Sequence, residues 1–221
     1  MKFTRLNAAT MVLALGAFAI AAWFYPQLPD PVPTHWNMHG VADDWTAKPM
    51  GVWLLPLITL VISAIMLVLP VISPRGFRLD SARRAYDIVI FLLVGFLIAV
   101  EVFSFRAAMS GGEELSEAIP VMMGFLFIAL GNYLGKFPKN FFVGIRTPWT
   151  LASDEVWNRT HRLAGYLFMA AGAGLAVIGF FETPAWLMIA FVGPAALIPV
   201  LYSLLLYRRL HGFGEEEPGE D

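Results

Sequence analysis

The chain has 221 residues, of which 58% are hydrophobic and 14% are charged, and its mean hydropathy is +0.66. Soluble domains carry roughly 25% charged residues, so this composition argues against a soluble globular protein. The formal net charge of −2 gives no reason to expect nucleic acid as a partner. Because the sequence contains no cysteine, it excludes disulfides, thiolate metal sites and cysteine nucleophiles.

Six apolar stretches are long enough to cross a bilayer as helices. A helical span needs about 20 apolar residues, and none of the six alternates with the two-residue period of a strand. The predicted spans are residues 7–25, 51–72, 86–107, 119–134, 163–181 and 185–207, and the fourth is the shortest. The predicted fold is therefore an all-α membrane protein with six transmembrane helices. The first stretch could also be a signal peptide, but its length and the bulky Trp23 and Tyr25 favour an uncleaved anchor.

Basic residues are concentrated in alternate segments between these spans. Those segments hold 13 of the 15 lysines and arginines: Lys2, Arg5, Arg75, Arg78, Arg83, Arg84, Lys136, Lys139, Arg146, Arg159, Arg162, Arg208 and Arg209. The opposite loops hold only Lys48, with Arg106 at the edge of the third span, and are otherwise acidic. The positive-inside rule then predicts that both termini are cytoplasmic.

The sequence suggests two helical units followed by a short tail. The predicted division is a two-span unit over residues 1–72, a four-span unit over 73–214 and a disordered acidic tail over 215–221. Gly131 and Gly135 form a G-x-x-x-G pattern in the fourth span, and the fifth span is rich in alanine and glycine. Small residues let helix backbones approach closely in lipid, so they predict helix contacts, within one chain rather than between two copies.

The first outer loop, residues 26–50, is rich in proline, histidine and tryptophan. Its prolines predict an extended, semi-rigid entry. His35, His39 and Asp43 are spaced four apart, which would suit a metal only on a helix, and Pro33 and Gly40 argue against one. No metal site and no cofactor are therefore predicted. Two interpretations remain open, a folded cap on the outer membrane surface and a recognition surface for an extracytoplasmic ligand.

The segment between the fourth and fifth spans, residues 131–168, is unusually dense in Asn, Arg, Thr, Trp and His. Its tryptophans and tyrosines are typical of a membrane–water boundary. Pro148 predicts an extended backbone at Thr147, and Ser153 suits a helix N-cap, with acidic residues in the following turn. A helix beginning there would carry Trp157 and His161 on one face and continue into the fifth span.

These residues form an ordered pattern that resembles the signature of the SdpI family of bacterial integral membrane proteins. The matching positions are Asn132, Asn140, Gly144, Arg146, Thr147, Pro148, Trp149, Thr150, Trp157, Thr160 and His161. The outer loop resembles the small domain of unknown function that often precedes this signature. Its matching positions are Pro29, Pro33, His35, Trp36, Gly40 and Lys48. The resemblance thus extends over most of the chain.

The resemblance implies a multi-pass protein of the bacterial plasma membrane. The family is named after a toxin-immunity protein that protects its producer from a secreted peptide toxin. It also implies a signalling role, in which a cytoplasmic transcriptional repressor is held at the membrane when toxin is present. The expected function is immunity to a membrane-active peptide, with membrane lipid, the toxin and such a repressor as partners.

No recognisable catalytic constellation accompanies this pattern. The sequence lacks H-E-x-x-H, G-x-S-x-G and P-loop motifs, and the predicted topology separates its four histidines, so we do not expect an enzyme. Glu101 is the one acidic residue well inside a predicted span, and intramembrane carboxylates are costly and often functional. Arg106 is five residues away, which is a poor helical spacing for a partner. Glu101 therefore supports an alternative function, coupled transport of an ion or a small solute.

Overall fold

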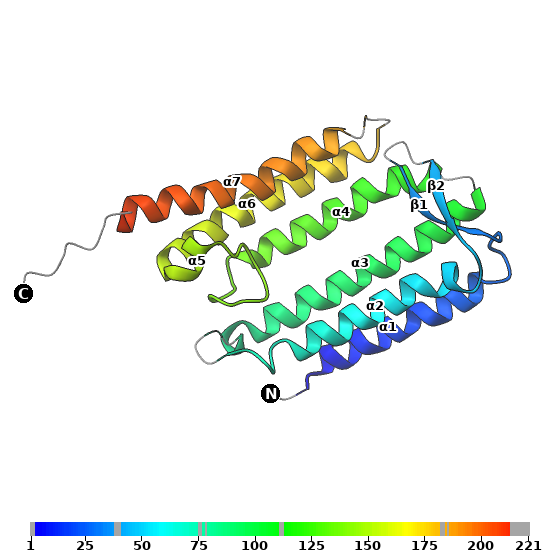
Figure 1. Ribbon diagram of the computed structural model, residues 1–221, viewed down its shortest axis with the longest axis horizontal. Coiled ribbons are helices and arrows are strands. Elements are labelled where there is room, and N and C mark those ends of the chain that lie inside the picture. Colours follow the sequence, from blue (N-terminus) through cyan, green and yellow to red (C-terminus); the bar gives the residue numbers. More distant parts are fainter. Residues whose placement is uncertain are drawn as a thin grey trace, which may run out of the picture.

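The structure is a computed structural model that describes residues 3–37, 41–74, 77, 79–110, 113–181, 184 and 186–212; for residues 113–117 only the backbone is described. Long helices dominate, and a hairpin interrupts them near the N-terminus (Figure 1). The elements are α1 (Arg5–Phe24), β1 (Val32–Trp36), β2 (Ala42–Thr46), α2 (Met50–Val68), a 3-10 turn η1 (Asp80–Ala82), α3 (Arg83–Ser110), α4 (Glu113–Leu134), α5 (Pro148–Ala152), α6 (Asp154–Ile178) and α7 (Trp186–His211).

Among the described residues, five helices are long and apolar enough to cross a membrane, namely α1, α2, α3, α6 and α7. The protein is therefore a multi-pass membrane protein, as the composition predicts. In α4 the apolar part covers only Ala118–Leu134, which is short for a span. Its role as a sixth span stays a prediction, and so does the side of the membrane on which the termini lie.

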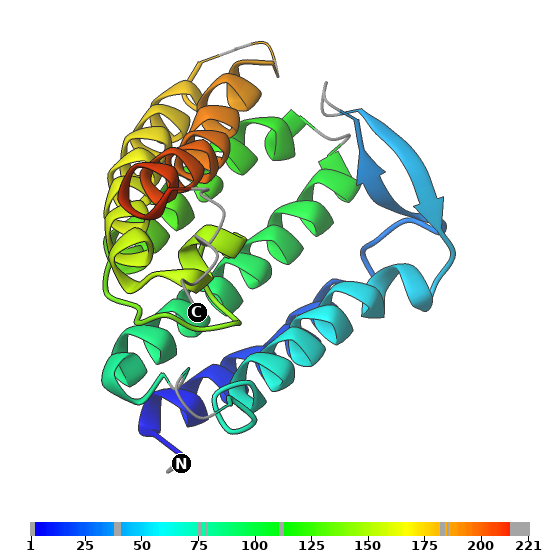
Figure 2. The ribbon, with the colours of Figure 1, turned by 60° about the vertical axis from the view of Figure 1, so that its left-hand side comes forward.

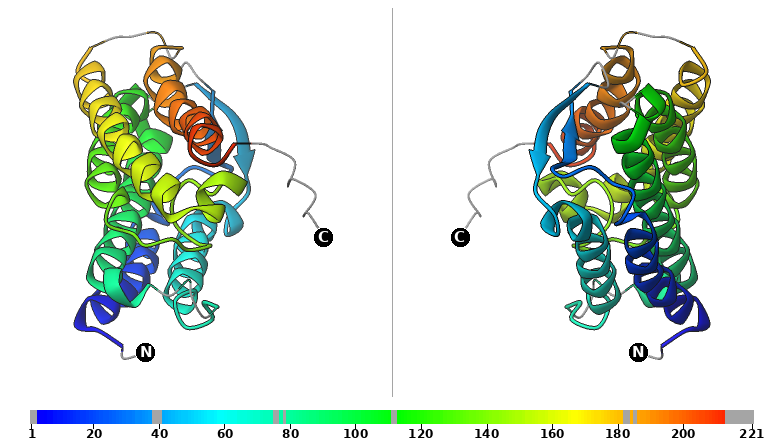
Figure 3. Two further views of the ribbon diagram at one scale, coloured as in Figure 1. Left: turned by 90° about the vertical axis from the view of Figure 1, so that its left-hand side faces the viewer. Right: turned by 90° about the vertical axis from the view of Figure 1, so that its right-hand side faces the viewer.

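The long helices form two groups of three. Helices α1, α2 and α3 pack on one another, and α6 packs between α4 and α7. Contacts between α3 and α4 join the groups, which lie side by side in Figure 2, with α7 on the far side from α1 in Figure 3. The start of α1 and the end of α7 lie at the same end as α5, whereas the hairpin lies at the opposite end (Figure 1). The predicted boundary at residue 72 falls in the connection between α2 and α3, and the independence of the two units remains a prediction.

Helices α4 and α6 approach each other through two pairs of glycines. A Cβ atom on Gly131 would lie 2.6 Å from the carbonyl oxygen of Gly165, and one on Gly124 would lie 2.6 Å from that of Gly172. The two pairs are seven residues apart on each helix, so they repeat along one face. Gly135, in contrast, has no neighbour closer than 3.8 Å. The predicted contact between helices of one chain exists. On α4 the close approach is made by Gly124 and Gly131, and Gly135, the other half of the G-x-x-x-G pair, takes no part in it.

Candidate functional site

The segment between α4 and α6 is held by one buried side chain, Asn140. We call residues 137–153 the signature loop. The Asn140 amide donates to the carbonyl oxygens of Pro138 (2.8 Å) and Val143 (3.1 Å), and its Oδ1 accepts from the backbone N–H groups of Phe142 (2.8 Å) and Val143 (2.7 Å). An amide group offers two donor hydrogens and one double acceptor, so all of its capacity is used inside the loop. Asn140 therefore fixes the backbone over residues 138–143.

His161 joins the signature loop to α6. Its Nε2 accepts a hydrogen bond from the backbone N–H of Ile145 (2.9 Å), and its Nδ1 lies 2.8 Å from the carbonyl oxygen of Trp157. Because Nε2 accepts, the proton must sit on Nδ1, and the buried ring is a neutral imidazole. Gly144 has a φ of 113°, and a Cβ there would lie 2.2 Å from Nε2. Only glycine fits this position without strain or overlap.

Trp157 completes the same contact. Its indole stacks on the His161 ring at a centroid distance of 3.9 Å, and its Nε1 donates to the carbonyl oxygen of Phe137 (2.8 Å). The side chain is only 1% exposed. We predicted that Trp157 and His161 would share a helix face, and the structure confirms it. The loop covers Trp157, and its expected place at the membrane–water boundary stays a prediction.

The second half of the signature loop is a chain of capped turns. Thr147 is extended (φ −103°, ψ 160°) and caps α5 in a reciprocal pair with Thr150. Thr150 Oγ1 also donates to the carbonyl oxygen of Ile145 (2.8 Å), and Thr147 Oγ1 lies 3.0 Å from Ser203 Oγ on α7. Ser153 then caps α6, and Asp154 and Glu155 occupy its first turn. These observations confirm the predicted extended Thr147 and the predicted helix start.

Other signature residues remain outside this hydrogen-bonded core. Arg146 is exposed, and its Nη1 donates to the carbonyl oxygen of Phe141. Pro148 and Asn132 are exposed as well, and Trp149 is half-buried. Thr160 is fully buried, and its hydroxyl has no partner within the described part of the chain. The surface of the signature loop thus offers Arg146 and Trp149 to a partner, together with the exposed ring of Phe141.

The first outer loop, residues 26–50, contains a β-hairpin whose strands pair antiparallel. The base of the hairpin is buried, because Val32 and Leu28 pack with Ala21, Val52 and Phe105 of the surrounding helices. Its outer half is open: Pro29, His35, Asp43, Asp44 and Trp45 are exposed, while Pro33 and Trp36 are partly buried. The hairpin tip, which includes His39 and Gly40, lies outside the described residues.

Lys48 fastens the hairpin to the end of α1. Its Nζ donates to the carbonyl oxygens of Tyr25 and Leu28, each at 2.7 Å, and lies 4.9 Å from the centre of the Tyr25 ring. Tyr25 is the C-cap of α1, where the helix dipole favours a cation. The single lysine of an otherwise acidic loop is therefore a helix cap rather than a surface charge.

On the hairpin, His35 and Asp43 are neighbours across the two strands and not along one helix face. The two side chains face each other across the strands, with Nδ1 2.5 Å from Oδ1, and both are exposed. Within the described residues, no three His, Cys, Asp or Glu side chains are placed to hold a metal ion. The pair is an exposed cross-strand contact.

Glu101 is fully buried in α3, and neither carboxylate oxygen has a hydrogen-bond partner among the described residues. Val94 and Phe105 lie on the same side of α3 and pack against residues of α1 and α2. Glu101 therefore lies on the α3 face that meets α1 and α2. An unsatisfied carboxylate in that place costs stability, which marks it as a candidate for function.

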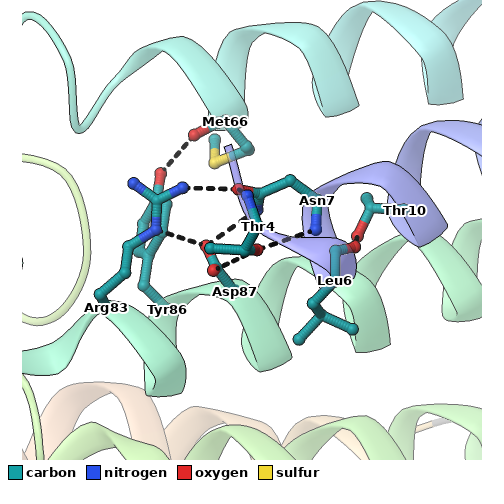
Figure 4. A network of polar contacts seen from close by, with 8 residues as sticks. All are labelled: Thr4, Leu6, Asn7, Thr10, Met66, Arg83, Tyr86 and Asp87. Atoms are coloured by element: carbon teal, nitrogen blue, oxygen red, sulfur yellow. Dashed lines mark hydrogen bonds and ion pairs between the residues drawn. The ribbon is translucent and has the colours of Figure 1, made fainter. Parts of the chain in front are cut away.

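A second buried polar group was not predicted from the sequence. Asp87 is 3% exposed, and it accepts hydrogen bonds from Thr4 (2.9 Å), Asn7 (2.9 Å) and Arg83 (2.8 Å), as Figure 4 shows. Arg83 also donates to Asn7 Oδ1 at 2.6 Å. The available signals were the i, i+4 spacing of Arg83 and Asp87 and a T-x-x-N capping box before α1. Neither signal shows that the start of α1 and the start of α3 contact each other.

Comparison with known proteins places this geometry in a family. Residues 136–203 match the model of the SdpI/YfhL protein family, and residues 12–60 match a domain of unknown function, DUF1648. The first match contains the whole signature loop, and the second contains the hairpin. Immunity protein SdpI of Bacillus subtilis (strain 168) is 24% identical over 208 residues, which is 93% of this chain and 98% of that protein. No solved structure matches the chain. One segment of the chain thus matches the SdpI/YfhL family, a DUF1648 segment precedes it, and nearly the whole chain is similar to Immunity protein SdpI.

Proposed function

We propose that this chain is an immunity protein, which protects a bacterium against a secreted, membrane-active peptide toxin. The observation that carries the proposal is the extent of the similarity to Immunity protein SdpI, which covers nearly the whole of both chains. A match of that extent includes the hairpin, the signature loop and all long helices, so it supports a shared overall task. The proposed location is the plasma membrane of a bacterium.

The two polar ends suggest a division of this task. The hairpin presents exposed His35, Asp43 and Trp45 on a base that is packed into the helices, which suits recognition of a peptide outside the cell. Aromatic and charged side chains on a fixed support are typical of binding surfaces. The signature loop presents Arg146 and Trp149 and would be the docking face for a cytoplasmic partner, such as a transcriptional repressor.

A survival experiment tests the proposal. A bacterium sensitive to the peptide toxin of this family would express the chain, and survival would be measured over a toxin titration. We expect the chain to protect and Arg146→Ala to lose protection while it still inserts into the membrane, because Arg146 is exposed and holds only Phe141. Arg159→Ala is the matched control, since Arg159 is also exposed and its charge contacts only surface partners, Glu155 of its own helix and Tyr202 of α7.

The outcomes separate the parts of the proposal. Full protection by Arg146→Ala would remove the signature loop from the mechanism. Equal loss in Arg159→Ala would point to general surface charge rather than to the signature. An inserted chain that gives no protection would rule out this toxin as its ligand.

A second candidate function, coupled transport of an ion or a small solute, is favoured only by Glu101. A buried carboxylate without a partner is the kind of group that binds a proton or a cation during transport. Glu101→Gln would then abolish solute flux in vesicles or alter its pH dependence. An unchanged flux profile in that variant would eliminate this candidate.

The predicted topology can be tested directly because the chain has no native cysteine. Single cysteines at Asp44 and Arg209 would report opposite sides of the membrane. In intact cells we expect a membrane-impermeant maleimide to label Asp44→Cys but not Arg209→Cys. Labelling of both, or of Arg209→Cys alone, would contradict cytoplasmic termini.

A further inference from the structure

A groove opens between the first turn of α1 and the first turns of α3. Its volume is about 530 Å³, and its lining combines three arginines, Arg5, Arg83 and Arg84, with the apolar Leu6 and Ile88. The groove lies beside the polar network of Figure 4 and at the end of two helices that are long enough to span a membrane. A molecule bound in this groove would contact both apolar side chains and cationic groups.

The one acidic residue in the lining, Asp87, is already neutralised. Its carboxylate accepts hydrogen bonds from Thr4, Asn7 and Arg83, and its side chain is buried. It therefore offers little repulsion to an anion in the groove.

The arginines, in contrast, retain unused donors. Arg83 uses Nε and one terminal nitrogen for Asp87 and Asn7, but its Nη1 is buried and has no hydrogen-bond partner within the described chain. Arg5 and Arg84 are exposed, and neither forms an ion pair with a described residue. Arg5 and Arg84 thus line the groove with unpaired charge beside the paired Arg83 and Asp87, and the groove is complementary to a negatively charged ligand.

We propose that this groove binds the headgroup of an anionic phospholipid, with its phosphate between Arg5 and Arg84 and an acyl chain along Leu6 and Ile88. The planar guanidinium matches the geometry of phosphate oxygens, and basic pockets between membrane helices are suited to acidic headgroups. The apolar part of the lining favours a lipid over free phosphate. Binding would clamp α1 to α3 from the membrane side, next to the network that joins them.

Native mass spectrometry of the purified full-length chain tests the site. The protein in detergent would be titrated with phosphatidylglycerol or with phosphatidylcholine of the same acyl chains, and retained lipid would be counted. We expect one phosphatidylglycerol to be retained in preference to phosphatidylcholine, and its affinity to fall about 5-fold for each arginine removed in Arg5→Gln and Arg84→Gln. Arg83 is left unchanged because it holds the network together.

The matched control is the double variant Arg208→Gln and Arg209→Gln at the end of α7. It removes the same charge from exposed positions that do not line the groove. We expect it to retain phosphatidylglycerol like the original chain. Equal loss in the control, or retention of both lipids alike, would overturn the proposal. Displacement of the lipid by millimolar inorganic phosphate would also overturn it, because the groove would then be an anion site without lipid selectivity.

Discussion

The hairpin and the signature loop are both polar regions at the ends of apolar helices, yet they use their polar groups in opposite ways. In the signature loop the amide of Asn140, the hydroxyls of Thr147 and Thr150 and the ring of His161 are directed at the loop backbone and at neighbouring helices. In the hairpin the polar side chains of His35, Asp43 and Asp44 are exposed, while Lys48 and the cross-strand pair of Thr34 and Thr46 form internal hydrogen bonds. The residues of the signature loop therefore mainly fix its backbone conformation, whereas the polar residues of the hairpin mainly form an exposed surface.

The location of the signature loop explains why its shape needs so many residues. Phe137 packs in a core cluster with Ala14, Leu79 and Tyr86, which belong to the other helix group. Thr147 reaches α7 through Ser203, and Trp157 anchors the loop on α6. The loop therefore holds together helices from both groups, and an error in its backbone would propagate into each of them.

The largest effect on stability is expected from Gly144→Ala. The substitution would place a side chain at a φ of 113° and against the Nε2 of His161, which adds strain of about 1–3 kcal/mol and removes the hydrogen bond to Ile145. Thermal unfolding in detergent should show a clear fall in Tm. Gly95→Ala is the control, because a Cβ there would meet nothing within 4 Å. A Tm equal to that of the original chain would contradict the tight contact between loop and histidine.

A somewhat smaller loss is expected from Asn140→Ala, because its backbone partners at Pro138, Phe142 and Val143 are only partly buried and water can replace most of the lost hydrogen bonds. It leaves two backbone N–H groups and two carbonyl oxygens to find other partners, at a cost of about 1–3 kcal/mol for each group that stays buried and unpaired. Hydrogen exchange should rise over residues 138–143. Asn132→Ala, at an exposed position, should change neither exchange nor Tm, and similar behaviour of the two variants would refute the scaffold interpretation of Asn140.

Lys48→Met should have an intermediate and local effect. Two hydrogen bonds from a charged group would be lost, together worth roughly 1.5–3 kcal/mol or more, while the apolar base of the hairpin stays intact. We expect limited proteolysis to cut the hairpin faster, with little change in the helices. If cleavage is no faster, the hairpin is held by its packing alone.

The smallest effect on stability is expected from His35→Gln. An exposed ion pair contributes about 0–1 kcal/mol, so Tm should hardly move. If the hairpin recognises the peptide, toxin survival should nevertheless fall. Together with Arg146→Ala this variant tests the contrast between exposed and buried polar residues. Substitutions at the exposed positions should lower protection without lowering Tm, whereas substitutions at Asn140 and Gly144 should lower both. An unchanged survival curve for His35→Gln would remove this side chain from recognition.

Much of the secondary structure could be predicted because its causes are local. Apolar length predicted α1, α2, α3, α6 and α7, and Thr147, Pro148 and Ser153 predicted the break and restart before α6. The hairpin could be predicted only in part, because proline excluded a helix but did not specify strand pairing. The spacing of His35 and Asp43 would suit a shared face only on a helix, and it gave no sign that the two side chains meet across two strands.

The sequence by itself determined that this is a membrane protein with an SdpI-like polar signature between the long helices. Composition, apolar length and motif order are properties of the chain alone. Only the tertiary structure decided which signature groups are buried, which glycines carry the α4–α6 contact, and that Asn7 and Asp87 meet across two helices. Those outcomes depend on contacts between residues up to 80 positions apart, and local pattern contains no information on which distant surfaces a side chain will face.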